Sequence, residues 1–214
     1  MTRIAVLGGT GYAGTNFVKE AAGRGHAVTS LSRSLPAEPV AGVEYVQGSL
    51  GDAASVSAAI DGADAIIATL SPRGDNAGNL ATAYQQLVAD LAGSGKPIVF
   101  IGGFSSLRPA PDAPRFADGE VPEAFAAEVH ELNGFREWLQ TSAPADSDWI
   151  FVSPAGTFGS FAPGEALGHY RTSGEIAIFD ENGESAISGA DFALAVIDLV
   201  ESGEHIGEHV SFAY

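Results

Sequence analysis

A glycine-rich turn between a short apolar run and a helical segment constrains this chain more than any other feature. The turn spans Gly8–Gly14 with the sequence GGTGYAG, and it directly follows the apolar run Ile4–Leu7. From Tyr12 to Ala22 apolar residues then recur at helical spacing. Glycines at this spacing, after a buried strand and before a helix, are typical of a turn that binds a dinucleotide pyrophosphate. The alternative is a glycine turn needed only for packing.

Each glycine of the turn has a separate expected role. Gly8 permits a tight turn, Gly11 lets the backbone approach a pyrophosphate, and Gly14 lets the helix pack closely on the strand. We expect the free amides of Gly11, Tyr12 and Ala13, together with the helix dipole, to favour an anionic ligand. Thr10 lies within the same turn. Because this attraction is local, it does not depend on the net charge of the chain.

Apolar runs alternate with helical patterns along the rest of the chain. The patterns predict strands at 26–31, 43–46, 65–68, 97–101, 149–152 and 209–212. They predict helices after a cap at Asp52, over 80–91, over 122–141 and, after a Ser188–Asp191 capping box, over 192–200. In the 122–141 helix Phe125, Val129, Leu132, Phe135 and Leu139 are expected to face inward. This rhythm predicts an α/β fold, a single-domain Rossmann-type doubly wound parallel sheet over residues 1–214.

The balance of charges and the missing cysteines exclude several classes of function. The chain has 10 Lys plus Arg against 27 Asp plus Glu, a net charge of −17, which argues against nucleic acid as a partner. No apolar stretch is long enough to span a membrane, and the N-terminal residues do not resemble a signal peptide. The absence of cysteine excludes disulfides and thiol chemistry. We therefore expect a cytoplasmic protein that binds neither nucleic acid nor membrane.

The residues after the second expected strand bear on the choice of coenzyme. NAD-binding turns usually place a carboxylate there for the ribose hydroxyls, but this chain has none between Ser30 and Glu38. It has Arg33, flanked by Ser32 and Ser34, and a guanidinium suits a 2′-phosphate. The pattern favours NADP(H) over NAD(H). The alternative is an arginine that simply faces solvent.

Together these motifs resemble a known family. The segment Ile4–Gly11 with Gly14 and Arg33 looks like the NAD(P)H-binding atypical short-chain dehydrogenases/reductases of the NmrA-like type. Three later segments, Ile101–Leu107, Asp148–Pro154 and Ile187–Ala193, are similar to NADH-flavin reductases and to the flavin reductase/biliverdin-IXβ reductase group. The resemblance covers nearly the whole chain.

The resemblance implies where the rest of the coenzyme would lie. Ser49 and Leu50 would flank the adenine, and Leu70, Ser71 and Pro72 would follow the ribose. The nicotinamide would be approached by Gly102 and Gly103 and covered by the segment that begins Ser153, Pro154, Ala155. These positions agree with the rule that ligands bind beyond the carboxyl ends of parallel strands.

The chain departs from the ordinary short-chain dehydrogenase in one respect. No tyrosine has a lysine four residues later, and Glu128 and Leu132 occupy the approximate positions of that pair. Hydride transfer to a flavin stacked on the nicotinamide needs no such acid. The resemblance therefore implies an NAD(P)H-dependent reductase of a flavin such as FMN, a quinone or a similar flat acceptor.

Candidates for direct contact with the acceptor lie in two irregular stretches, at about 103–122 and 153–172, which we expect to form the acceptor site. The resemblance places Ser105 near the reacting rings, although a serine that only bonds its own turn is an alternative. Phe104 and Phe158 suit a flat ring, and Tyr170 is a further candidate; buried loop anchors are the alternative. No metal site is expected from His205 and His209 with their neighbouring glutamates.

Two other functions are compatible with parts of the sequence. A non-catalytic NADP(H)-sensing regulator acting through a protein partner would also lack the Tyr-x-x-x-Lys pair. A sugar-nucleotide epimerase shares the glycine turn, but it would need that pair and a larger substrate domain. The sequence is compatible with a monomer or a homodimer.

Overall fold

One eight-stranded sheet runs through the computed structural model, which describes residues 1–214, in the order β3-β2-β1-β4-β5-β6-β8-β7. All neighbouring pairs are parallel except β7 and β8, which are antiparallel. The strands are β1 (Arg3–Leu7), β2 (Ala27–Ser32), β3 (Val43–Gln47), β4 (Ala65–Ala68), β5 (Ile98–Ile101), β6 (Trp149–Ser153), β7 (Arg171–Ser173) and β8 (Glu208–Ala213). The order reverses at β1, as in a Rossmann-type fold, so the predicted fold class is confirmed. The sequence pattern did not predict the short edge strand β7.

Five α-helices and three short 3₁₀ helices connect the strands. The α-helices are α1 (Tyr12–Gly23), α2 (Ala53–Ile60), α3 (Leu80–Leu91), α4 (Glu123–Ser142) and α5 (Gly189–Ser202). The 3₁₀ helices are η1 (Gly74–Asn76), η2 (Phe104–Ser106) and η3 (Phe116–Asp118). No helix is both long enough and apolar enough to cross a membrane.

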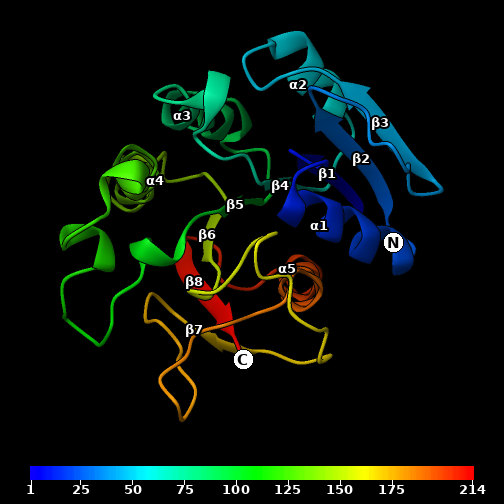
Figure 1. Cartoon of the computed structure of the whole chain (residues 1–214). Helices are drawn as coiled ribbons and strands as arrows, with labels where there is room; N and C mark the ends of the chain where they lie inside the picture. Colours follow the sequence, from blue (N-terminus) through cyan, green and yellow to red (C-terminus); the bar gives the residue numbers. More distant parts are fainter.

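The helices cover the two faces of the sheet in separate groups (Figure 1). Helices α1 and α5 bury Phe17 and Phe192 against one face, together with alternate strand residues such as Val6 and Val99. Helices α2, α3 and α4 cover the other face, where Tyr84, Phe100 and Phe135 pack together. Because alternate strand residues point to opposite faces, each inner strand contributes to both cores, which explains its continuous apolar sequence.

Both helix caps that the sequence predicts are present, but the capping box at the start of α5 is incomplete. Asp52 accepts a hydrogen bond from the Ala54 amide at the start of α2, and the Ser188 hydroxyl accepts one from the Asp191 amide at the start of α5. The Asp191 carboxylate, however, accepts bonds from the Leu167 and Gly168 amides instead of completing the capping box. Asp191 therefore ties the loop after β6 to the start of α5.

One residue of α4 was predicted wrongly. Phe125 was expected to face inward but is 51% exposed. The buried residues of α4 are Leu132, Phe135, Arg136 and Leu139, none of them in its first two turns. The first turns of α4 have no buried residue, so helical periodicity alone misplaced Phe125.

Candidate functional site

The glycine turn lies at the carboxyl end of β1, where the strand order reverses. Gly8 has a φ of +100°, which an L side chain rarely adopts, and its amide donates to the Leu31 carbonyl at 2.8 Å. A Cβ at Gly14 would lie 2.1 Å from the Gly8 carbonyl oxygen, and one at Gly9 would lie 2.1 Å from Ser30 Oγ. The turn therefore requires glycine at Gly8, Gly9 and Gly14 for reasons internal to the fold.

Gly11 is different, because the fold itself leaves space beside it. A Cβ at Gly11 would meet its nearest neighbour, the Gly8 carbonyl oxygen, at an ordinary 3.5 Å. The Gly11 amide donates to that same oxygen at 3.1 Å, so the prediction that this amide is free is wrong. The amides of Tyr12, Ala13 and Gly14, in the first turn of α1, donate to no acceptor in the chain. Three unpaired amides at the positive end of a helix dipole suit an anion.

A cavity of about 380 Å³ opens in front of this turn, beyond the carboxyl ends of β1, β2, β3 and β4. Many of the predicted coenzyme-binding residues line it: Gly8, Thr10, Gly11, Ser32, Arg33, Ser49, Leu50, Leu70 and Ser71. Tyr12, Ala13 and Gly14 form the helical turn behind it. Pro72 is buried and does not line the cavity. We call this cavity the coenzyme groove.

Ser34, which was named with Ser32 beside Arg33, also lines the groove. The lining residues that sequence reasoning missed are Leu31, Gly48, Thr69, Arg73, Gly74 and Asn76. Arg73 is the most informative of them, because it brings a second guanidinium to the groove. A signal for it was present in the sequence: like Arg33, it is a rare cation that closely follows a strand end. The sequence patterns predicted a coenzyme-binding arginine only after the second strand.

Both arginines of the groove already have a carboxylate partner. Arg33 Nη1 lies 2.9 Å from Asp75 Oδ2, and the two side chains are 57% and 88% exposed. Arg73 Nε lies 2.6 Å from Glu128 Oε2 on α4. A phosphate in the groove would therefore meet arginines that are already paired, Arg33 with an exposed carboxylate and Arg73 with a mostly buried one.

The residues predicted to surround the nicotinamide do not line the coenzyme groove. Gly102 and Gly103 follow β5, and Ser153, Pro154 and Ala155 begin at the end of β6. The Ser153 hydroxyl donates to the Gly103 carbonyl oxygen at 2.9 Å, which joins the two strand ends. A Cβ at Gly102 would lie 2.2 Å from the Phe151 ring, so this position also requires glycine.

A buried histidine supports this junction from β8. His209 Nε2 lies 2.9 Å from Ser153 Oγ, and its ring packs edge-on against Phe151. Burial, with the nearby positive charges of Arg115 and Arg136, lowers the pKa of His209 to about 3. The ring is therefore neutral, and its Nδ1 has no hydrogen-bond partner. His205, which pairs with Glu208 at 2.6 Å, is exposed by comparison, and no group of three or more His, Asp or Glu side chains is arranged to hold a metal ion.

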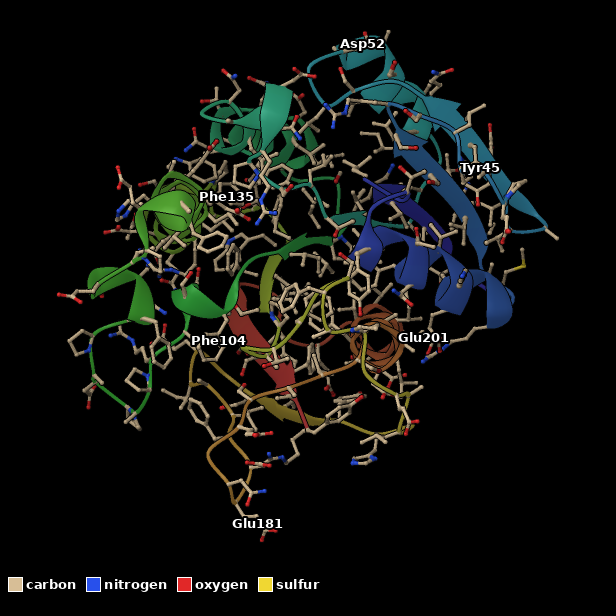
Figure 2. The ribbon with its side chains drawn as sticks, in the orientation of Figure 1. Tyr45, Asp52, Phe104, Phe135, Glu181 and Glu201 are labelled. Carbon is tan, nitrogen blue, oxygen red and sulfur yellow. The ribbon has the colours of Figure 1, made fainter.

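The candidate acceptor residues fall into three places. Ser105 lies on η2, and its hydroxyl makes no hydrogen bond within the chain, so the self-bonded turn serine is not what the structure shows. Phe104, labelled in Figure 2, stacks on Phe116 with ring centroids 4.8 Å apart. Phe158 packs edge-on against Tyr12 at 5.4 Å, beside the glycine turn. Tyr170 lies elsewhere.

Tyr170 points away from the coenzyme groove and toward α5. Its hydroxyl donates to Asp198 at 2.7 Å, and its ring packs edge-on against Phe212. Burial and the bond to Asp198 raise the pKa of Tyr170 to about 12, so it stays a neutral phenol. It lines a separate hollow of about 180 Å³, none of whose lining residues is shared with the groove.

The two α4 residues at the approximate positions of a Tyr-x-x-x-Lys pair have other uses. Leu132 is buried in the core shared with α3, and Glu128 pairs with Arg73. Neither side chain can serve as the phenol or the ammonium of such a pair.

Comparisons with known proteins agree with this geometry. A family model described as NAD(P)H-binding matches residues 8–202. A protein from Burkholderia pseudomallei, described as a candidate exported protein, is 34% identical over 100% of both chains, with a TM-score of 0.83. A candidate NADH-flavin reductase from Streptococcus pneumoniae is 30% identical over 100% of this chain and 99% of the other, with a TM-score of 0.85. A candidate epimerase from Bacteroides thetaiotaomicron is 29% identical over 100% of this chain and 97% of the other, also with a TM-score of 0.85.

Proposed function

The chain belongs to the NAD(P)H-binding family, and from this premise we propose that it is an NAD(P)H-dependent reductase of a flat acceptor, a flavin or a quinone. The observation that carries the proposal is the coenzyme groove in front of the glycine turn. The amides of Tyr12, Ala13 and Gly14 have no acceptor in the chain, and the fold leaves the space beside Gly11 unfilled. A groove beside unpaired amides at a helix N-terminus would suit the pyrophosphate of a dinucleotide.

NADP(H) is the preferred coenzyme in this proposal. Arg33 lines the groove on the β2 side, where the 2′-phosphate of the adenosine ribose would lie. Ser34 lines the same wall and offers a hydroxyl group, whereas the Ser32 hydroxyl already donates to the Ser34 carbonyl oxygen at 2.9 Å. No carboxylate occupies the position after β2 that would favour the free 2′-hydroxyl of NAD(H).

The acceptor site is proposed at the other end of the sheet's carboxyl edge, between the loops at about 103–122 and 153–172. When bound, the nicotinamide supplies a hydride for a ring stacked on it. The chain's contribution is to hold the two rings together and exclude water, and no Tyr-x-x-x-Lys pair is needed for that. The Streptococcus pneumoniae relative, described as a candidate NADH-flavin reductase, supports the choice of a flat acceptor.

Residues on η2 and after β6 would shape that acceptor site. The Ser105 hydroxyl has no partner in the chain and is free to bond an acceptor heteroatom. The hydrogen bond from the Ser153 hydroxyl to the Gly103 carbonyl oxygen holds the backbone just before η2, the short helix that contains Ser105. Phe104, which stacks on Phe116, and Phe158, which packs against Tyr12, are the aromatic side chains proposed to contact the acceptor.

The test measures both binding and turnover. We expect NADPH to bind clearly tighter than NADH, and NADPH to be consumed with at least one of FMN, riboflavin and a simple quinone. We expect Arg33→Ala to remove the preference for NADPH without weakening NADH binding. Equal dissociation constants for the two coenzymes in the wild type would contradict the role of Arg33. Binding of NADPH without turnover of any acceptor would instead favour a non-catalytic NADP(H)-sensing protein.

A further inference from the structure

One wall of the coenzyme groove is an exposed segment between β4 and α3. Residues 71–79 contain a single buried residue, Pro72, and the segment includes η1. Gly74 and Gly78 have φ values of +58° and +73°, so the segment bends at two glycines. With so little apolar burial, its position depends on its polar contacts.

These polar contacts connect the segment to both of its neighbours. On the β2 side, the Arg33–Asp75 pair joins it to the opposite wall of the groove. On the other side, two carboxylates of α4 hold it. Glu128 pairs with Arg73, and Glu131 accepts bonds from the Gly78 amide at 2.7 Å and the Ala81 amide at 3.1 Å.

Glu131 supplies a helix cap that α3 does not provide for itself. The N-cap residue of α3 is Asn79, whose side chain makes no capping hydrogen bond. The partly buried Glu131 carboxylate takes that role from a neighbouring helix, with one oxygen on each amide. Bonds from amides to an ionised carboxylate at a positive helix end are stronger than neutral ones. Glu131 therefore attaches this wall to α4 through two hydrogen bonds from backbone amides to its carboxylate.

We propose that Glu131 is a positioning residue for coenzyme binding. It fixes the start of α3, and through it the segment that carries Arg73 and Asn76 into the groove. It touches neither coenzyme nor acceptor. This inference rests on the proposed function, because it assumes that the groove binds NADP(H).

The experiment compares Glu131→Ala and Glu131→Gln with a matched control, Glu137→Ala. Glu137 lies on the same helix, is exposed and has no side-chain hydrogen bond to the segment. For Glu131→Ala we expect the dissociation constant and KM for NADPH to rise about tenfold, with kcat at saturating NADPH unchanged. Glu131→Gln, which keeps an acceptor oxygen, should recover part of the loss, and Glu137→Ala should match the wild type.

A second measurement reports on the wall without coenzyme. Amide hydrogen exchange of Gly78 and Ala81 should become about tenfold faster or more in Glu131→Ala, and it should not change in Glu137→Ala. Unchanged NADPH binding in Glu131→Ala would overturn the role of Glu131 and leave the proposed function standing. A lower kcat at an unchanged KM would also overturn it. Failure of the wild type to bind NADPH or NADH would overturn the proposed function itself.

Discussion

At the scale of single residues, the positive charges of the groove are already neutralised by carboxylates. The chain has 27 acidic against 10 basic side chains, and both arginines of the groove pair with a carboxylate. Asp75 is that partner for Arg33, at 2.9 Å. A 2′-phosphate must replace this carboxylate to reach the guanidinium, whereas a free 2′-hydroxyl need not. Asp75 therefore competes specifically with NADP(H).

We expect Asp75→Asn to tighten NADPH binding by about twofold to fivefold and to leave NADH binding unchanged. An exposed ion pair contributes up to about 1 kcal/mol, which corresponds to this range. Titration of both coenzymes by fluorescence measures the two dissociation constants. Asp146→Asn, the same change at an exposed residue outside the groove and both acceptor loops, is the control. An equal gain for NADH and NADPH would show a general charge effect instead.

At the scale of elements, the contact between α1 and β1 depends on the absence of a side chain at Gly14. A Cβ at Gly14 would lie 2.1 Å from a backbone carbonyl oxygen, which cannot rotate away. The helix would have to move off the strand, and its first-turn amides would move with it. By contrast, a Cβ at Gly134 on α4 would meet no atom within 4 Å. The same substitution should therefore have opposite effects at the two positions.

We expect Gly14→Ala to lower the free energy of unfolding by about 1–3 kcal/mol and to abolish tight NADPH binding, because overpacking shifts the backbone. We expect Gly134→Ala to raise it by about 0.5–1 kcal/mol, because alanine is the better helix former. Urea denaturation followed by circular dichroism measures both. A Gly14→Ala variant with the stability and NADPH affinity of the wild type would disprove the close approach of α1 to β1.

At the scale of the whole molecule, one buried histidine links stability to pH. His209 is 5% exposed, and burial and the charges of Arg115 and Arg136 lower its pKa to about 3. In the unfolded chain a histidine has a pKa near 6.5 and takes up a proton below that pH. The folded protein does not, so the free energy of unfolding falls as the pH drops from about 6.5 toward 3.

We expect this loss to approach about 1.4 kcal/mol per pH unit between pH 4.5 and 6, above the range in which most carboxylates titrate. His209→Gln should be less stable at pH 7 but should lose most of this slope. His130→Gln, at an exposed residue, should keep it. Denaturant titrations at several pH values give the slope. Equal slopes in His209→Gln and the wild type would show that His209 does not cause it.

Fold and site differ in how far the sequence predicts them, and the reason is the range of the interactions involved. The strand and helix boundaries follow from local periodicity, and Gly8 and Gly14 are required by a turn within one βα unit. Arg33 could be placed in the groove because it directly follows a strand. The environments of Phe125 and Tyr170 could not be predicted in this way. The surroundings of a residue on a helix or in a long loop depend on which distant element packs against it.

The sequence by itself determined the α/β fold, the glycine turn and the local preference for an anion at the start of α1, since these depend on neighbouring residues. Only the tertiary structure showed that Asp75 pairs with Arg33 and that Glu131 caps α3. It also placed His209 beneath Ser153, although 56 residues separate them along the chain. The residues in these contacts are far apart in the sequence, and no periodic pattern links them. Only the packing of the sheet and helices brings them together.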